Sequence, residues 1–539
     1  MEALGSFRVP IVLGVPMRGT GTLPLSEAPV QARRRHRFHI ALADALIIVA
    51  LGVIAFVVRR HVPADGLFYD DAWQAVGAWQ GSFSEFVSVG QTQPGFTVGL
   101  MAWLRLFGTE TAALVTPALI AGTLGPPALY ATLRHFRYAR SVALLVAAAL
   151  VSAQVHILYS YHVKTYTFDV LVILGIALAA WHLASHTWRT STAVTWFAVS
   201  VVVGSFSSIA LIAVAVVALI LALHPSGDRK IRLITAGAQL MALAVLYLAS
   251  SRTYNYERIH AFFASRGGYI EFDPNPVAFG SEVFSHFWHV ADVFPGGLPT
   301  LALAAGAGGL LVAAWRGSVV VPARFLVLMV VIAAGGSVVE LVPFGPPRFL
   351  GRVSLWWVPA MALGLCAALD LARRRVPTRG ALRVGFDAAA WIGAVLVLVS
   401  SFGTDHPYPA GARAAIRQVM TEAGPDDAVV MTWPTRYSFA LYADTPVGLR
   451  DTPERQIGFL PTFVDRRLHQ HDVTTTAEEF EGFVEGIDRV YVVHAMINGR
   501  RLPEYLFNLA VALDLRGFRR ESTRTIETGR IDVWRREAT

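Results

Sequence analysis

Two adjacent carboxylates, Asp70 and Asp71, are the first candidates for chemistry in this sequence. They lie in the segment Asp65–Trp73, which is rich in aromatic residues and directly follows a long apolar stretch. A carboxylate in such a position can act as a general base for a hydroxyl group, while its neighbour orients it or holds a cation. A structural role is the alternative, because aspartate at the start of a helix caps free backbone N–H groups. The pair alone leaves both interpretations open.

A second group of candidates lies between residues 159 and 169. Lys164 is notable because only two of the 46 basic residues are lysines. Its compact ammonium group suits phosphate binding, whereas a lysine that snorkels from a helix end is the alternative. Asp169 would lie about one turn inside an apolar helix, where a charge needs a partner, and Lys164 is the partner that we expect. Tyr166 would lie beside Lys164, and His162 could hold a metal or a phosphate, although an isolated interfacial histidine usually does neither.

The elements that must position these residues are membrane helices. Hydrophobic residues make up 54% of the 539-residue chain and charged residues only 16%, whereas about 25% of an average soluble chain is charged. This composition excludes a soluble multidomain enzyme, a disordered regulator and a disulfide-stapled secreted module. The single cysteine, Cys366, cannot form an internal disulfide.

Eleven apolar stretches have lengths that suit membrane crossings, or nearly so. The fifth is short, and the break at Gly204-Ser205 leaves open that it forms one bent helix with the sixth. We therefore predict an α-helical polytopic membrane protein with about eleven transmembrane helices. The stretches are Ile40–Val58, Ala112–Leu133, Ser141–Leu158, Tyr166–Leu183, Ala193–Gly204, Ser207–Leu223, Leu233–Leu248, Leu298–Ala314, Phe325–Leu341, Leu355–Leu371 and Ala388–Ser401.

The basic residues mark one side of this membrane. When the N-terminus is placed in the cytosol, every inner connection is basic, as cytoplasmic loops are. With an odd number of crossings, the C-terminus is then outside. The first apolar stretch is long enough to remain as a span, so we expect no cleaved signal peptide. The inner segments are 33–37, 134–140, 186–189, 228–232, 316–324 and 373–383, and the long outer ones are 61–95 and 251–297.

These patterns divide the chain into a cytosolic tail (1–37), a membrane domain (38–402) and an extracytoplasmic α/β domain (403–539). In the last part strands alternate with helices, which predicts a small three-layer α/β unit. Its sequence shows no phosphate-binding loop and no metal-ligand set, so we expect a cover over the active cavity or a docking module for the acceptor. The predicted helices are 412–422, 476–487 and 502–513, and the predicted strands are 427–432, 489–494 and 531–534.

The order of the motifs along the chain resembles that of a known family. After the acidic pair come the Gln91–Phe96 element, the pattern Lys164-x-Tyr166-x-x-Asp169 and the Pro347–Leu350 element. Over roughly residues 38–402, this order resembles the GT-C superfamily of integral-membrane glycosyltransferases, in the family-39-like branch that includes protein mannosyltransferases and lipid A aminoarabinose transferases. The chain departs from the family pattern at Asp71, where glutamate is commoner, and at Gly95, where a second proline is usual.

The resemblance implies an inverting glycosyltransferase at the outer face of a bacterial plasma membrane, working in cell-envelope assembly. It implies a polyprenyl-phosphate-linked sugar as the donor and a hydroxyl group of a glycan, lipid or protein as the acceptor, and we expect no nucleic acid partner. Asp70 would be the base. Asp71 would position it or a divalent ion, which is optional because protein cations can neutralise a monophosphate leaving group. The expected phosphate ligands are Lys164, Tyr166, Arg348 and Arg352, with Asp169 and His162 in supporting roles.

Two other classes of function stay open. A transporter or flippase of lipid-linked sugars would also have many spans, but it is expected to carry an inverted repeat and broken helices at the membrane midplane. A non-catalytic scaffold that presents the outer domain would make Asp70 and Lys164 dispensable.

A zinc site in the outer loop Arg252–Gly297 is a separate hypothesis. Glu282, His286 and His289 have a spacing that places them on one helix face. No further ligand is evident, so we rather expect this aromatic-rich loop to lie on the bilayer and to shape the entrance for lipid or acceptor.

Overall fold

A computed structural model describes most of the chain. Two units can be distinguished, Met1–Leu46 and Ile47–Thr539. The described part of the first unit is the beginning of helix α1 (Val30–Arg59), which starts before the predicted span. The described residues are 30–60, 66–80, 94–224, 228–251, 263–264, 267–291, 299–315, 319–344, 355–377, 380–402, 411–424, 427–431, 435–443, 457–459, 484–495 and 503–537.

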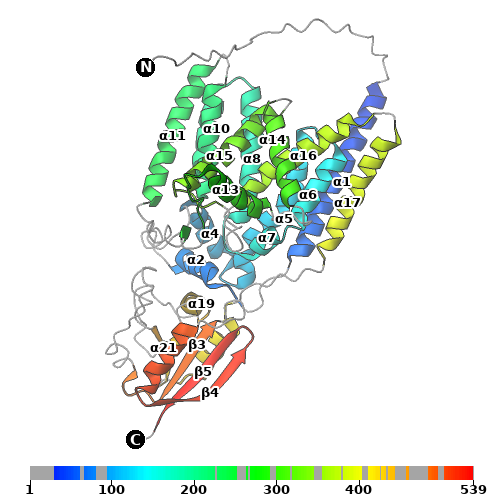
Figure 1. The fold of residues 1–539 in the computed structure, drawn as a ribbon. Helices are drawn as coiled ribbons and strands as arrows, with labels where there is room; N and C mark the ends of the chain where they lie inside the picture. The colour runs from blue at the N-terminus through cyan, green and yellow to red at the C-terminus, as the bar shows by residue number, and fades with distance from the viewer. Residues whose placement is uncertain are drawn as a thin grey trace. The chain divides into compact units, whose positions relative to one another are not determined.

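The predicted polytopic helical class is confirmed, because ten of the eleven apolar stretches coincide with one helix each and the stretch Ser141–Leu158 coincides with two (Figure 1). Within the described residues, seven helices are long and apolar enough to cross a membrane, one bent pair passes the same test together, and three apolar helices are shorter. These helices are α1, α5 (Thr111–His135), the bent pair α6 (Arg140–Val151) and α7 (Gln154–Leu158), α8 (Tyr166–Ser185), α9 (Thr190–Gly204), α10 (Ser208–Leu223), α11 (Arg229–Ser251), α14 (Pro299–Trp315), α15 (Val320–Val338), α16 (Val358–Arg375) and α17 (Ala381–Ser400).

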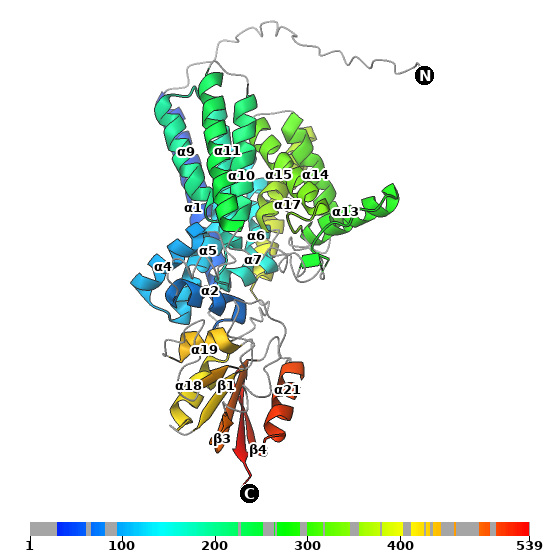
Figure 2. The same ribbon diagram turned by 90° about the vertical axis from the view of Figure 1, so that its left-hand side faces the viewer.

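The break at Gly204-Ser205 separates two helices that pack side by side. Helices α9, α10 and α11 all contact one another, as Figure 2 shows. Ser207 caps α10, because its side-chain oxygen accepts the N–H of Ala210 at 2.9 Å. The sharp bend occurs instead between α6 and α7, at 57°. The open alternative of a single bent helix through Gly204 is therefore wrong.

Two of the segments predicted to be cytosolic contact each other. Arg232 forms an ion pair with Asp228 at 3.1 Å and donates a hydrogen bond to the carbonyl oxygen of His186 at 2.8 Å. Segments 186–189 and 228–232 therefore share one end of the helices, as the charge pattern predicts. The assignment of that end to the cytosol stays a prediction.

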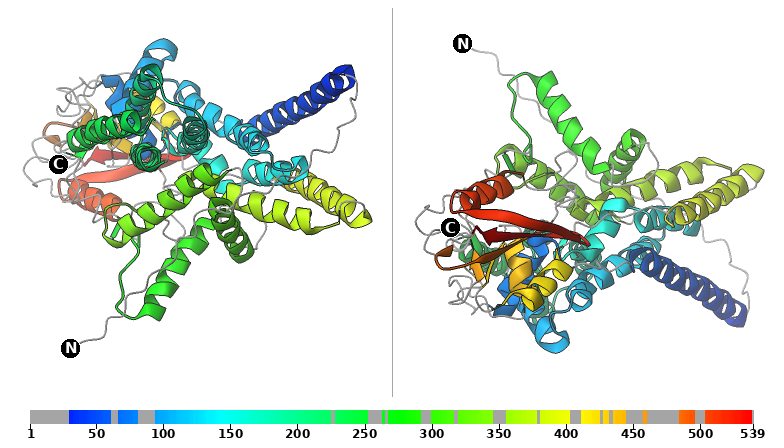
Figure 3. Two further views of the ribbon diagram at one scale, coloured as in Figure 1. Left: turned by 90° about the horizontal axis from the view of Figure 1, so that it is seen from above. Right: turned by 90° about the horizontal axis from the view of Figure 1, so that it is seen from below.

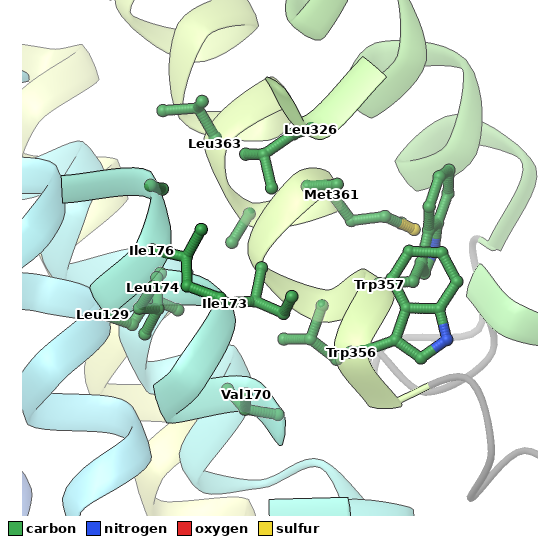
Figure 4. Close-up of a cluster of buried hydrophobic side chains, with 14 of the residues drawn as sticks. Leu129, Val170, Ile173, Leu174, Ile176, Leu326, Trp356, Trp357, Met361 and Leu363 are labelled. Atoms are coloured by element: carbon green, nitrogen blue, oxygen red, sulfur yellow. The ribbon is translucent and has the colours of Figure 1, made fainter. Parts of the chain in front are cut away.

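The membrane domain has one large apolar core. Figure 4 shows Val170 and Ile173 of α8 in one buried cluster with Leu326 of α15 and Met361 of α16. Helices α14 and α16 approach each other closely, because a Cβ atom placed on Gly364 would lie only 1.9 Å from the carbonyl oxygen of Gly306. Small residues at such a contact let two membrane helices pack backbone to backbone.

Three further helices belong to the segments between the spans. Helix α2 (Tyr69–Gln80) packs against α4 (Pro94–Phe107). Helix α13 (Pro276–Ala291) contacts α14 and runs at a steep angle to it (Figure 2). Helix α2 lies in the first predicted outer segment, α4 begins at the last two residues of that segment and continues beyond it, and α13 lies in the second.

The C-terminal part is a three-layer α/β unit, as the alternation of helices and strands predicts. Its sheet has the strand order β2-β1-β3-β5-β4, with parallel pairing among the first three strands and antiparallel pairing among the last three. Figure 3 shows α18 and α21 on opposite sides of this sheet. The elements are α18 (Arg413–Glu422), β1 (Ala428–Met431), α19 (Arg436–Tyr442), β2 (Ile457–Phe459), β3 (Arg489–Ala495), α21 (Pro503–Asp514), β4 (Phe518–Ile526) and β5 (Gly529–Arg536).

The elements predicted for this part are present where the structure describes them. The predicted helices 412–422 and 502–513 and all three predicted strands correspond to observed elements. The predicted helix 476–487 lies mostly outside the described residues. The boundaries of the three predicted domains, at 37 and 402, stay predictions.

Candidate active site

Asp71 is the anchor of the acidic pair. It lies in the first turn of α2, where its backbone N–H donates to the carbonyl oxygen of Phe68 at 2.9 Å. Its side chain is fully buried. One carboxylate oxygen, Oδ2, lies 2.7 Å from Nδ1 of His162, and the other, Oδ1, accepts the backbone N–H of Val163 at 3.0 Å. The carboxylate thus joins α2 to a segment that is 92 residues away along the chain.

The segment that receives Asp71 connects α7 to α8. It contains a short 3₁₀ turn, Tyr159–Tyr161, after which His162 adopts an extended conformation with φ −96° and ψ 141°. The His162 ring packs on Tyr159 with a centroid distance of 4.7 Å, and its edge meets Phe68 at 6.4 Å. The imidazole is almost completely buried. Aromatic packing on two sides therefore fixes the ring that holds Asp71.

The residues of the predicted lysine motif follow directly. Lys164 lies two residues after His162, and its backbone N–H donates to the His162 carbonyl oxygen at 2.8 Å. Tyr166, the first residue of α8, makes an edge-on ring contact with Tyr159 at 5.2 Å. Both side chains are partly exposed. The structure therefore brings the backbone of the lysine motif next to the start of α2, the helix of the acidic pair.

Three of the predicted site residues are only partly described or lie outside the description. Asp70 is the second residue of α2, but its side chain lies outside the described part of the structure. Arg348 and Arg352 lie outside the described residues altogether. The predicted roles of these three residues stay predictions.

Asp169 has partners other than the one that we expected. Its Oδ1 accepts a hydrogen bond from Ser207 at 2.6 Å, and its Oδ2 accepts one from Thr165 at 3.5 Å. The expected pairing with Lys164 is thus replaced by two hydroxyl groups, which satisfy a buried carboxylate without a countercharge. Because Ser207 also caps α10, Asp169 ties the start of α8 to the start of α10, and its predicted role of orienting the lysine stays a prediction.

Arg59 is a buried residue that the sequence interpretation missed. It is the last residue of α1, and its side chain is completely buried. Its guanidinium donates to the carbonyl oxygen of Leu150 at 3.0 Å and to Nδ1 of His156 at 3.0 Å. Within the described residues, no carboxylate forms an ion pair with it. The hydroxyl of Tyr161 donates to the carbonyl oxygen of Val58 at 3.4 Å in the same region. In the sequence, an arginine at the end of an apolar run looks like an ordinary interfacial anchor, so nothing indicated its burial.

Among the described residues, no group of three or more histidine, cysteine, aspartate or glutamate side chains could hold a metal ion. Glu282 and His286 do lie 3.3 Å apart on α13, but the side chain of His289 lies outside the described part. Both oxygens of Asp71 already accept hydrogen bonds, which favours a positioning role over metal binding. The zinc and divalent-ion hypotheses stay predictions.

Comparisons with known proteins identify the class of fold. No protein-family model and no curated protein sequence matches the chain. Among solved structures, the chain has a fold similar to that of ArnT, which agrees at the level of the fold with the resemblance drawn from the sequence.

Two of these structures are of ArnT from Cupriavidus metallidurans. The one bound to undecaprenyl phosphate matches with a TM-score of 0.52 and 15% identity over 91% of this chain and 97% of that chain. The one in the apo state matches with a TM-score of 0.53 and 15% identity over 92% of this chain and 98% of that chain. The match includes the C-terminal part as well as the membrane helices, since it covers nearly the whole of both chains.

Proposed function

We propose that this chain is an inverting glycosyltransferase that moves a sugar from a polyprenyl-phosphate donor to an acceptor hydroxyl at the outer face of the bacterial plasma membrane. The observation that carries the proposal is the contact of buried Asp71 with His162 and Val163. This contact joins the helix of the acidic pair to the lysine motif, as a shared transfer site requires. Support also comes from the likeness to ArnT, which was solved with undecaprenyl phosphate bound.

The acidic side of the site supplies the base. Because His162 and Val163 hold both oxygens of Asp71, the first turn of α2 is fixed, and Asp71 acts by positioning. Asp70, the preceding residue of that turn, is then the carboxylate that takes the proton of the acceptor hydroxyl. A base held by a rigid helix start loses little freedom when the reaction begins.

The basic side of the site receives the leaving group. Lys164, Arg348 and Arg352 supply positive charge to the lipid phosphate, and the Tyr166 hydroxyl is a further donor. The acceptor oxygen forms a bond to the anomeric carbon while the bond from that carbon to the phosphate oxygen breaks. The proton goes to Asp70 and the polyprenyl phosphate leaves, so a single displacement inverts the anomeric centre. The reaction balances without a metal ion, and envelope glycans, lipids or proteins are the acceptors that this placement offers.

The experiment that tests this function uses the purified full-length protein in lipid vesicles with a sugar-labelled polyprenyl-phosphate donor and a mixture of envelope acceptors. We expect label in an acceptor and release of polyprenyl phosphate. A flippase would move the intact donor across the vesicle membrane without cleaving it, and a scaffold would leave the donor where it is. Either of those two results would overturn the proposal.

A further inference from the structure

The C-terminal α/β domain holds the backbone of Leu67 from both sides. The N–H of Leu67 donates to the phenol oxygen of Tyr442 at 2.8 Å, and its carbonyl oxygen accepts a hydrogen bond from Ser438 at 3.3 Å. Gly411 packs on the same carbonyl group, because a Cβ atom placed there would lie 1.9 Å from the oxygen. Leu67 itself is fully buried and lies three residues before Asp70.

Tyr442 is fixed by further contacts. Its hydroxyl lies 3.1 Å from Oγ1 of Thr111, at the start of α5. The guanidinium of Arg413 lies 5.4 Å from the centre of the tyrosine ring and pairs with Glu110. Burial raises the pKa of Tyr442 to about 12, so the phenol keeps its proton at neutral pH. It can therefore accept from Leu67 and donate to Thr111 at the same time.

Apolar packing supports these polar contacts. Helices α19 and α2 pack against each other. One buried cluster includes Leu67, Ala72 and Val76 from the first outer segment together with Ile416 and Phe439 from the α/β domain. The start of α2 therefore packs into a hydrophobic core that it shares with the α/β domain, so the contact extends beyond the hydrogen bonds to Leu67.

We propose that the α/β domain positions the acidic pair, with Tyr442 as its main positioning residue. The inference rests on the proposed function, because it assigns the domain a part in the same transfer site. With Leu67 fixed, the carbonyl oxygen of Phe68 stands where it accepts the N–H groups of Asp71 and Ala72, both at 2.9 Å. These bonds begin α2, and α2 carries Asp70. The domain thus acts through the backbone of the acidic segment rather than as a cover over the cavity.

The test compares Tyr442→Phe with Tyr491→Phe, which removes a phenol from β3 of the same domain and leaves Leu67 untouched. In the full-length protein, we expect Tyr442→Phe to unfold at nearly the wild-type temperature and to speed amide hydrogen exchange in residues 66–72. We expect kcat for sugar transfer to fall by about 10- to 100-fold, with the KM values for donor and acceptor almost unchanged, because a misplaced base loses rate rather than binding. Tyr491→Phe is expected to change none of these quantities.

Three results would overturn the inference: unchanged exchange in residues 66–72, an unchanged kcat, or a rise in the acceptor KM alone, as a docking module would give. If Tyr442→Phe does not fold, Ser438→Ala removes the second contact to Leu67 and carries the same expectations. If the wild-type protein transfers no sugar, the proposed function fails, whereas the exchange measurement still decides whether the domain holds Leu67.

Discussion

At the scale of single residues, the buried contact between Asp71 and His162 has the largest consequences. A carboxylate that is completely removed from water needs strong hydrogen bonds, and removing one partner leaves the other unsatisfied at a cost of about 1–3 kcal/mol or more. The same contact holds the start of α2 beside the lysine motif. Its loss should therefore affect both stability and transfer.

The pairing of these two residues can be measured with a double-mutant cycle. We expect Asp71→Asn and His162→Gln each to lower kcat for transfer by at least about tenfold, because either change loosens α2 from the segment before α8. The double variant should lose much less than the product of the two effects, since each single change already breaks the same contact. Rates for the wild type, both single variants and the double variant provide the check. Independent, multiplicative effects would show that the pair does not act as a unit.

Asp532 in β5 gives the α/β domain a predictable response to acid. Burial opposes the ionisation of Asp532, but hydrogen bonds from His494, Thr523 and Arg530 outweigh it and lower its pKa to about 2. The folded pKa lies below the ordinary value of about 4, so this stabilisation is complete above pH 4 and is lost as the pH falls towards 2. Arg530 and Thr523 donate to the same Oδ1 atom at 2.7 and 2.6 Å.

We expect Asp532→Asn to lower the free energy of unfolding of the domain by about 1–2 kcal/mol at pH 6. The difference from the wild type should shrink as the pH is lowered from 4 to 2, because the wild-type carboxyl group then also becomes neutral. Denaturant unfolding of the full-length protein, followed through the amide exchange of β4 and β5, measures both values. A difference that is the same at pH 6 and at pH 2.5 would contradict the assignment.

At the scale of elements, the start of α4 packs against the turn between α9 and α10. The N–H of Gly95 donates to the carbonyl oxygen of Ser205 at 2.9 Å. A Cβ atom at this position would lie 2.1 Å from the Ser205 hydroxyl oxygen and 2.9 Å from its carbonyl carbon. Proline, which is usual here in the family that the sequence resembles, has no N–H to donate and carries a Cβ. The departure at Gly95 therefore matches the local packing of this chain.

Gly95→Ala should destabilise the protein by about 1–3 kcal/mol, because the contact is with backbone atoms that cannot move aside easily. Gly99→Ala is the matched control in the same helix, since the nearest atom to a Cβ there is 3.8 Å away. The control should be neutral or slightly stabilising, as alanine favours helices over glycine. Thermal unfolding in detergent compares the two variants. Equal unfolding temperatures would mean that the contact with Ser205 does not limit this position.

Some elements follow from the sequence and others do not. The apolar stretches predicted the membrane helices because a bilayer demands long runs of apolar residues. The bend between α6 and α7 falls at Ser152-Ala153 without a proline, so no local signal marked it. Strand β4 was missed because its arginine and glutamate residues face solvent. Only its pairing with β5 makes it a strand.

At the scale of the whole molecule, the sequence marked the segments that are candidates for chemistry but not how they meet. The acidic pair and the lysine motif have recognisable residue types and spacing. The contact between Asp71 and His162 depends on the packing of α2 against a segment far along the chain, which periodicity cannot show. Tyr442 lies in a stretch without any motif, and only the fold places it against Leu67. Asp169 has a hydroxyl partner, Ser207, for the same reason.

The central claim is that Asp70 acts as the base beside a cationic site for the lipid phosphate. The most direct measurement is sugar transfer from a polyprenyl-phosphate donor by purified wild-type protein and by Asp70→Asn, with donor binding and thermal unfolding measured on both. We expect the variant to fold and to bind donor as the wild type does, and to transfer sugar about 100- to 10,000-fold more slowly. Transfer at the wild-type rate by Asp70→Asn would contradict the claim.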